Sequence, residues 1–267
     1  MAPIQLEPFD HDPICFGFSW QIEDEDRLAR VVAVLVLGYF QHAAQILQVL
    51  TTRDPVPPPE MIDAAIAKLR RPVVDALRWH RDGWVFQMIS WIAARLAEGG
   101  NVVASAPQPR MADKGLDGLI IRLTPTGDDL ECIIVCEDKA SEDARRTVRD
   151  QVWPELEEFE TGRRDSEILS QASALLSGRP IPDIETLITR LFWDGRRHYR
   201  ISVCVSEVHG SPEGRLRLFG GYDTKVPGPN NRRRAETVRI DALRDWMDRF
   251  CEAVIAQLEM VRGGGHV

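Results

Sequence analysis

The sequence predicts an α/β fold in which helices flank a mixed β-sheet, preceded by an N-terminal helical extension. Two apolar runs of strand length, residues 116–123 and 130–139, stand on either side of a segment rich in Thr, Gly and Asp. This pattern predicts two antiparallel strands joined by a turn. Segments with apolar side chains at helical spacing lie before and after them. A chain of 267 residues is long enough for one large domain, or for a core with an appendage.

The N-terminal part of the chain carries helical signals. Residues 23–50 place apolar side chains at helical spacing, and the acidic residues at the start of this segment complement the helix dipole. A proline-rich run at residues 54–59 ends that helix and acts as a stiff connector to a short helix at residues 60–69. We therefore predict a helical extension over residues 1–71 and an α/β core over residues 72–267.

The predicted core opens with a helix and then mixes strands and helices. Residues 84–96 are apolar on almost all sides, which predicts a buried helix. Pro154 is expected to kink or divide the helix that follows the second apolar run. The other predicted elements are, in order, a strand at 102–105, the two strands at 116–123 and 130–139, helices at 141–159, 165–176 and 184–192, strands at 199–208 and 215–222, and a helix at 240–261.

Acidic and basic side chains gather at the ends of the two apolar runs. Successive side chains of a strand point to opposite faces, so Glu137 and Lys139 share a face and Asp138 points away. If the two runs pair, Asp117 comes beside Glu137. Two carboxylates and a lysine then converge at a solvent-facing strand end. Such a group is suited to hold a divalent metal ion and to activate a water for phosphodiester cleavage.

This arrangement resembles the PD-(D/E)XK nuclease superfamily, whose pattern is an acid on the second core strand and (D/E)-x-K on the third. Asp117 matches the first acid, and Glu137 with Lys139 matches the tripeptide. The resemblance covers roughly residues 79–261 and implies a restriction-endonuclease-like mixed sheet core. Leu116 stands where the pattern has proline.

The resemblance implies a Mg²⁺ or Mn²⁺ cofactor and gives each matching residue a role. Asp117 and Glu137, with the backbone carbonyl of Asp138, would hold the ion. Lys139 would orient or deprotonate the attacking water, or stabilise the developing negative charge. Gln87 replaces the acid that the preceding helix often carries. It would face a metal-bound water or, alternatively, be a core glutamine satisfied by backbone groups.

The helix after the second apolar run often carries, in this superfamily, a polar or basic residue that reaches the site. Gln151, Arg145 and Arg149 are the candidates, and the sequence does not choose among them. Arg145, Arg146 and Arg149 are also expected to contact nucleic acid, although arginine clusters are more often solvated helix faces. A net charge of −8 argues against a broad basic surface, but it is compatible with a basic rim around an acidic centre.

The position of the Glu-x-Lys tripeptide carries more information than the tripeptide itself. The same spacing recurs at Asp223 and Lys225, but there it lies between Gly-Gly and Pro-Gly-Pro, which predicts a loop. Only four of the 33 basic residues are lysines. Arginine is a poor substitute where a compact charge is needed beside a metal-bound water. The alternative interpretation of Glu137 to Lys139 is a strand that ends in a solvated turn.

These observations predict a metal-dependent endonuclease with DNA favoured over RNA, in a setting such as bacterial restriction or anti-phage defence. The alternative is a non-catalytic subunit that keeps the nuclease fold as a scaffold or nucleic-acid clamp. The apolar stripe of residues 26–50 must be buried somewhere. It could pack against the α/β core or against the same helix in a second subunit. Because the proline-rich connector would let the helices stand apart from the core, we expect a homodimer, or a complex with a partner protein such as an ATPase or helicase.

The remaining composition predicts a cytoplasmic protein without membrane contact. Five cysteines without metal-ligand spacing indicate free thiols in a reducing compartment rather than disulfides or a zinc site. The most apolar stretch, residues 31–37, is far shorter than the roughly 20 residues that a membrane span needs. The N-terminus lacks a positively charged leader.

Overall fold

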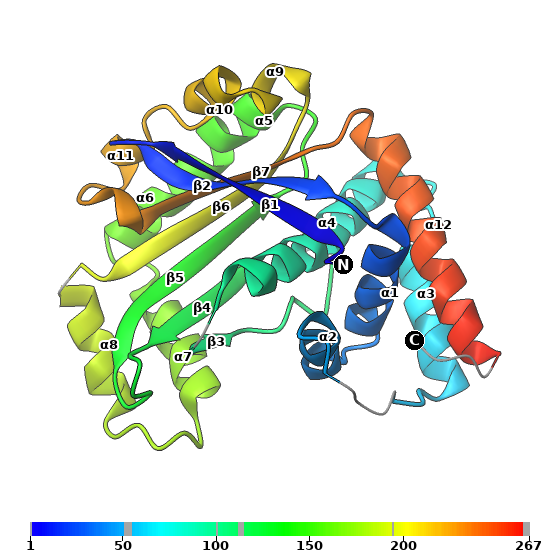
Figure 1. Cartoon of the computed structure of the whole chain (residues 1–267), viewed down its shortest axis with the longest axis horizontal. Helices are drawn as coiled ribbons and strands as arrows, with labels where there is room; N and C mark the ends of the chain where they lie inside the picture. The colour runs from blue at the N-terminus through cyan, green and yellow to red at the C-terminus, as the bar shows by residue number, and fades with distance from the viewer. Residues whose placement is uncertain (1, 51–54, 100, 112–114, 194, 264–267) are drawn as a thin grey trace.

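The computed structural model describes residues 2–50, 55–99, 101–111, 115–193 and 195–263, which fold around a seven-stranded sheet (Figure 1). The strands are β1 Ile4–His11, β2 Cys15–Ile22, β3 Val102–Ala104, β4 Gly118–Leu123, β5 Leu130–Lys139, β6 Arg197–Val205 and β7 Arg233–Arg239. Their order across the sheet is β1-β2-β7-β6-β5-β4-β3. Strands β2, β7, β6 and β5 run parallel, while β1 and β4 run antiparallel to their neighbours. The predicted mixed α/β class is confirmed.

Helices cover both faces of the sheet (Figure 1). One layer contains α1 Glu25–Val36, α2 Phe40–Leu47, α3 Pro59–Leu69, α4 Asp75–Ala97 and α12 Leu243–Arg262. The other layer contains α5 Ala144–Thr147, α6 Trp153–Glu160, α7 Asp165–Leu176, α8 Ile184–Trp193, α10 Pro212–Leu218 and α11 Tyr222–Lys225, with α9 Glu207–Gly210 before α10. Side chains alternate along each strand, so Val238 packs on the first layer and Ala235 on the second. None of the helices in the described ranges is long and apolar enough to cross a membrane.

Residues 4–22 form a β-hairpin that was not predicted from the sequence. Strand β1 pairs with β2, and β2 continues the sheet by pairing in parallel with β7, Gly17 opposite Ala235. Glycine is required there, because a Cβ at Gly17 would lie 1.6 Å from the carbonyl oxygen of Ala235. The N-terminal part of the chain therefore begins with two strands of the central sheet, and only then continues as the predicted helices.

The apolar stripe of α1 is buried within the same chain. Leu28, Val31 and Val32 are fully buried in a cluster that also contains Val238 of β7 and Phe250 of α12. The same buried cluster contains residues from both sides of the predicted boundary at residue 71, such as Leu69 and Trp84. Residue 54, the first of the predicted connector, lies outside the described residues. The α1 part of the stripe is covered by α12 and α4, so it does not need a second subunit for its burial.

Two elements between residues 210 and 240 differ from the sequence prediction. The expected strand at 215–222 is instead helix α10, which Ser211 caps by accepting a hydrogen bond from the backbone N–H of Gly214 at 3.0 Å. The next strand is β7, whose arginine-rich start concealed it. The guanidinium of Arg233 is 2% exposed, because it donates to backbone carbonyls that include Val226 at 2.9 Å. In the sequence, buried arginines of this kind cannot be told from the exposed arginines of a surface loop.

The elements around the predicted site match the sequence closely. Strand β5 has the predicted bounds, and so does α7. The segment after β5 is divided, as expected for Pro154, by a π-helix at Val148–Val152. Proline has no N–H to donate within a helix. The wider π turn, in which the N–H of Trp153 bonds the carbonyl of Val148, accommodates this missing donor.

Replacing Gly17 with alanine tests the place of the N-terminal hairpin in the sheet. The new methyl group would overlap the backbone of β7, so we expect a loss on the order of 3 kcal/mol or more in the free energy of unfolding, measured by urea denaturation. Gly83→Ala is the matched control. Gly83 lies within α4 with open space around it, so alanine there should stabilise the protein by about 0.5–1 kcal/mol. A Gly17→Ala protein as stable as the wild type would contradict the β2–β7 pairing.

Candidate functional site

Asp117 is held just before β4 by a chain of hydrogen bonds from helix α4. The indole N–H of Trp84 donates to the carbonyl oxygen of Gln108 at 2.8 Å. The side-chain amide of Gln108 in turn donates to the carbonyl oxygen of Leu116 at 3.0 Å. Leu116 itself is buried. The backbone that leads into Asp117 is therefore tied to α4 through Gln108.

The carboxylate of Asp117 joins helix α4 to strand β5. One oxygen accepts a hydrogen bond from the side-chain amide of Gln87 at 2.5 Å, and the other accepts from the backbone N–H of Asp138 at 2.8 Å. The antiparallel register pairs Gly118 with Cys136, so Asp117 comes opposite Glu137. The structure thus brings Asp117, Gln87 and the end of β5 together, as the sequence predicted.

Glu137 and Lys139 form an ion pair on one face of β5. Glu137 is only 5% exposed, so the expectation of a solvent-facing strand end is wrong for this residue. The ammonium of Lys139 also lies 3.5 Å from the carboxylate of Glu155, in the first turn of α6. Sequence reasoning missed Glu155. The available signal was its place one turn after Gln151 and directly after Pro154.

The three carboxylates compete for one ammonium. Burial, and then the negative charge of Asp138, raise the pKa of Asp117 to about 6. Burial and the charge of Asp117 raise the pKa of Glu137 to about 7. Burial and a hydrogen bond shared with Glu137 raise the pKa of Glu155 to about 7. Burial alone would lower the pKa of Lys139, but the surrounding carboxylates outweigh it and raise that pKa.

The side chain of Asp138 points to the opposite face, as predicted. It accepts a hydrogen bond from the hydroxyl of Ser90 at 2.5 Å and lies 3.5 Å from the guanidinium of Arg200. Burial raises the pKa of Asp138, and the charge of Arg200 opposes that shift. Asp138 thus anchors the end of β5 to α4, and its side chain is separated from the Glu137–Lys139 pair.

Of the polar residues predicted to reach the site from the segment after β5, none contacts Lys139. Gln151 is exposed, and Glu155, one turn later, is the residue that reaches Lys139. Arg145 donates to the carbonyl oxygen of Leu218 at 2.6 Å. Arg146 and Arg149 pair with Asp150 on the surface. Asp223 and Lys225 lie in the short helix α11 rather than in a loop.

The side chains at this site suit a hard divalent cation in their chemistry. Its carboxylates and the carboxamide of Gln87 supply oxygen atoms, which Mg²⁺ and Mn²⁺ prefer as ligands. The carboxamide oxygen of Gln87 is buried beside Asp117 without a hydrogen-bond partner among the described residues. Within the described ranges, no three His, Cys, Asp or Glu side chains are grouped closely enough to hold an ion as they stand. The Lys139 ammonium pairs with Glu137, a candidate ligand, and with Glu155.

Comparison with known proteins adds no identification. No protein-family model, no curated protein and no solved structure matches the chain significantly. The candidate site therefore rests on its own geometry and electrostatics.

The raised carboxyl pKa values predict how the metal-free protein responds to pH. The folded chain keeps protons on Glu137 and Glu155 that the unfolded chain loses above its ordinary pKa of 4.5. Stability from these groups is therefore complete below pH 4.5 and falls as the pH rises toward 7. Glu137→Gln should remove part of this loss and raise the melting temperature at pH 8 by roughly 3 °C or more.

Thermal melts with and without Glu137→Gln, recorded from pH 5 to 8 in a chelating buffer, check this expectation. Glu158→Gln, which changes an exposed residue of the helix that carries Glu155, is the control and should leave the pH profile unchanged. Equal behaviour of the two variants would show that Glu137 is not electrostatically destabilised in the folded state.

Proposed function

We propose that this chain is a metal-dependent nuclease of the PD-(D/E)XK type that acts on DNA in preference to RNA. The observation that carries this proposal is the convergence of Asp117, Glu137 and Lys139 from two neighbouring strands on one largely buried spot. The crowding of Asp117, Glu137 and Glu155, whose pKa values are raised to about 6 or 7, supports a site built for a cation.

Asp117 and Glu137, with the backbone carbonyl of Asp138, would hold Mg²⁺ or Mn²⁺. The unpartnered carboxamide oxygen of Gln87 lies beside Asp117, where it is available to accept a hydrogen bond from a coordinated water. A bound ion of this kind supplies positive charge at the scissile phosphate and lowers the pKa of a water.

Lys139 is best suited to stabilise negative charge. Its raised pKa keeps the ammonium protonated at neutral pH, because the carboxylates around it outweigh the effect of burial. A protonated lysine does not accept a proton from water. Of the roles open to Lys139, charge stabilisation at the phosphate oxygens is therefore the one that the electrostatics support.

Glu155 is the residue best suited to act as the general base. Its pKa of about 7 lies near the working pH, where a carboxylate is present but still accepts protons readily. It is less buried than Glu137 and reaches the site from a different element, α6. We assign it the proton of the attacking water.

The exposed side chains of Arg146 and Arg149 support a contact with the phosphate backbone. They precede α6, which carries Glu155. Arg145 is already engaged by the backbone of Leu218. A cytoplasmic role in restriction or anti-phage defence, a second subunit and an ATPase or helicase partner remain predictions from the sequence.

A non-catalytic subunit with a nuclease-like core is the alternative. Two observations favour it: Gln87 stands in place of a helix acid, and Glu137 is neutralised by its own chain through Lys139. Metal-dependent cleavage separates the two proposals.

The direct test incubates the protein with plasmid DNA, single-stranded DNA and RNA, with Mg²⁺, with Mn²⁺ and with a chelator. We expect cleavage of DNA that depends on the metal. Glu137→Gln, Lys139→Met and Glu155→Gln should each lower the rate by about 100-fold or more, because each removes a charge acting in the transition state.

Asp223→Asn and Lys225→Met are the matched controls. They repeat the acid-x-lysine spacing in α11, away from β5, and Lys225 pairs there with Glu157. Both should cleave at the wild-type rate. Absence of cleavage by the folded wild-type protein on every substrate, or full activity of Glu137→Gln, would refute the nuclease proposal.

A further inference from the structure

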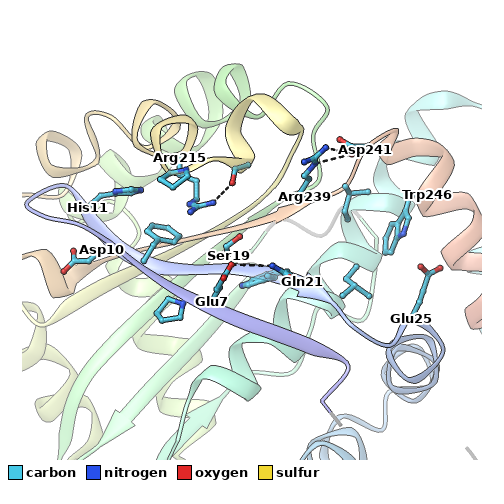
Figure 2. Close-up of a pocket in the computed structure, with 17 residues that line it drawn as sticks. Glu7, Asp10, His11, Ser19, Gln21, Glu25, Arg215, Arg239, Asp241 and Trp246 are labelled. Carbon is cyan, nitrogen blue, oxygen red and sulfur yellow. Dashed lines mark hydrogen bonds and ion pairs between the residues drawn. The ribbon is translucent and has the colours of Figure 1, made fainter.

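A cavity of about 910 Å³ lies over the N-terminal hairpin (Figure 2). Its floor comes from β1 and β2, and its walls come from α9, α10, the end of β7 and the start of α12. Strands β7 and β6 separate this hairpin from β5, which carries Glu137 and Lys139. The cavity is therefore distinct from the candidate nuclease site.

Arg215 is a buried cation at one end of this cavity. Its side chain reaches from α10 toward the hairpin (Figure 2), and the residue is 8% exposed. One nitrogen donates to the carbonyl oxygen of Gly210 at 2.5 Å, and the guanidinium lies 4.9 Å from the ring centre of Phe9. In the part of the chain that the structure describes, Arg215 forms no ion pair within contact distance of a carboxylate, and its Nε is buried without a hydrogen-bond partner. Glu7 and Glu213 act on its charge only from a distance, and burial outweighs them and lowers its pKa. Buried charges in proteins are normally paired.

His11 adds a second unpartnered nitrogen at the same end. Its Nε2 is buried and finds no hydrogen-bond partner among the described residues, and Figure 2 shows the ring beside Arg215. Burial, and then the positive charge of Arg215, lower the pKa of His11, while Asp10 and Glu213 oppose that shift. A negatively charged group between Arg215 and His11 would satisfy both side chains.

The rest of the cavity lining limits what this negatively charged group can belong to. Glu7, Asp10 and Glu25 line it, and Arg239 is paired with Asp241 at 3.1 Å. Carboxylates therefore outnumber arginines along the cavity, so a polyanion such as nucleic acid would be repelled. A dianionic phosphate would be repelled more strongly than a carboxylate with its single charge.

We propose that the Arg215–His11 end of the cavity binds one carboxylate, carried by a ligand whose remaining charge is positive. The C-terminus of a basic peptide has this distribution of charge. Its carboxylate would accept hydrogen bonds from Arg215 and His11, and its basic side chains would lie along Glu7 and Glu25. A volume of about 910 Å³ leaves room for the residues before the terminus.

Fluorescence anisotropy with the full chain tests this site directly. The probe is a short labelled peptide that ends in two lysines, prepared with a free C-terminal carboxylate and, separately, as the C-terminal amide. We expect the free acid to bind at least about tenfold more tightly than the amide, because the amide cannot neutralise Arg215. Glu7→Gln should weaken the binding of both peptides, because Glu7 is exposed and meets the lysines.

Arg215→Lys should lower the affinity for the free acid to that for the amide, with folding checked by a thermal melt. If this variant fails to fold, NMR of the wild-type protein decides, with the His11 signal assigned through His11→Gln. The imidazole pKa of His11 should rise when the free acid binds and stay unchanged with the amide. Equal affinity for acid and amide, binding of neither, or displacement of the peptide by an oligonucleotide would each overturn the proposal.

Discussion

The buried guanidinium of Arg200 fixes the end of β5, and the candidate site depends on that placement. Arg200 is 1% exposed and donates to Glu236 of β7 at 2.6 Å and to a backbone carbonyl of α4 at 3.1 Å, while it lies 3.5 Å from Asp138. With Asp138 engaged on this face, strand alternation places Glu137 and Lys139 on the other. A buried pair of this kind is strongly destabilising to break, by ~3–5 kcal/mol. The polar network beneath α4 therefore determines which side chains the site receives.

On the opposite face of β5, the buried carboxyl groups of the site are electrostatically unfavourable. Burial and the charge of Asp117 raise the pKa of Glu137 to about 7, and burial and the hydrogen bond shared with Glu137 raise the pKa of Glu155 to about 7. Near neutral pH the two groups therefore hold protons that most carboxylates have lost. A core built for stability alone would place apolar residues there. Sites with several shifted pKa values are typical of binding and catalysis. The same carboxylates raise the pKa of Lys139 and keep it protonated. A protonated lysine is not suited to act as a base.

The sequence predicts the strand that carries the site, but it does not predict the β1–β2 hairpin or strand β7. Residues 130–139 are a long apolar run that ends in charge, and both the bounds of β5 and the pairing with Asp117 followed from it. Strand β7 was not predicted, because the arginines at its start are typical of exposed segments. In the structure these arginines are buried, and Arg234, for example, is 4% exposed. The β1–β2 hairpin was not predicted, because the edge strand β1 contains a proline and charged residues and has few apolar positions. Glu155 could not be chosen, because its reach depends on how α6 packs on the sheet, which a linear pattern does not encode.

The central claim is that Asp117 and Glu137 form a cation site whose protons must leave when the ion binds. Isothermal titration of Mn²⁺ into the metal-free protein at pH 6.5, in two buffers of different ionisation enthalpy, measures both events together. We predict saturable binding with heats that differ between the buffers, because a proton is released. We also expect loss of that binding in Asp117→Asn and its retention in Asp223→Asn. Two results would contradict a cation site at Asp117 and Glu137. One is absence of binding to the folded wild-type protein, and the other is binding that releases no proton and persists in Asp117→Asn.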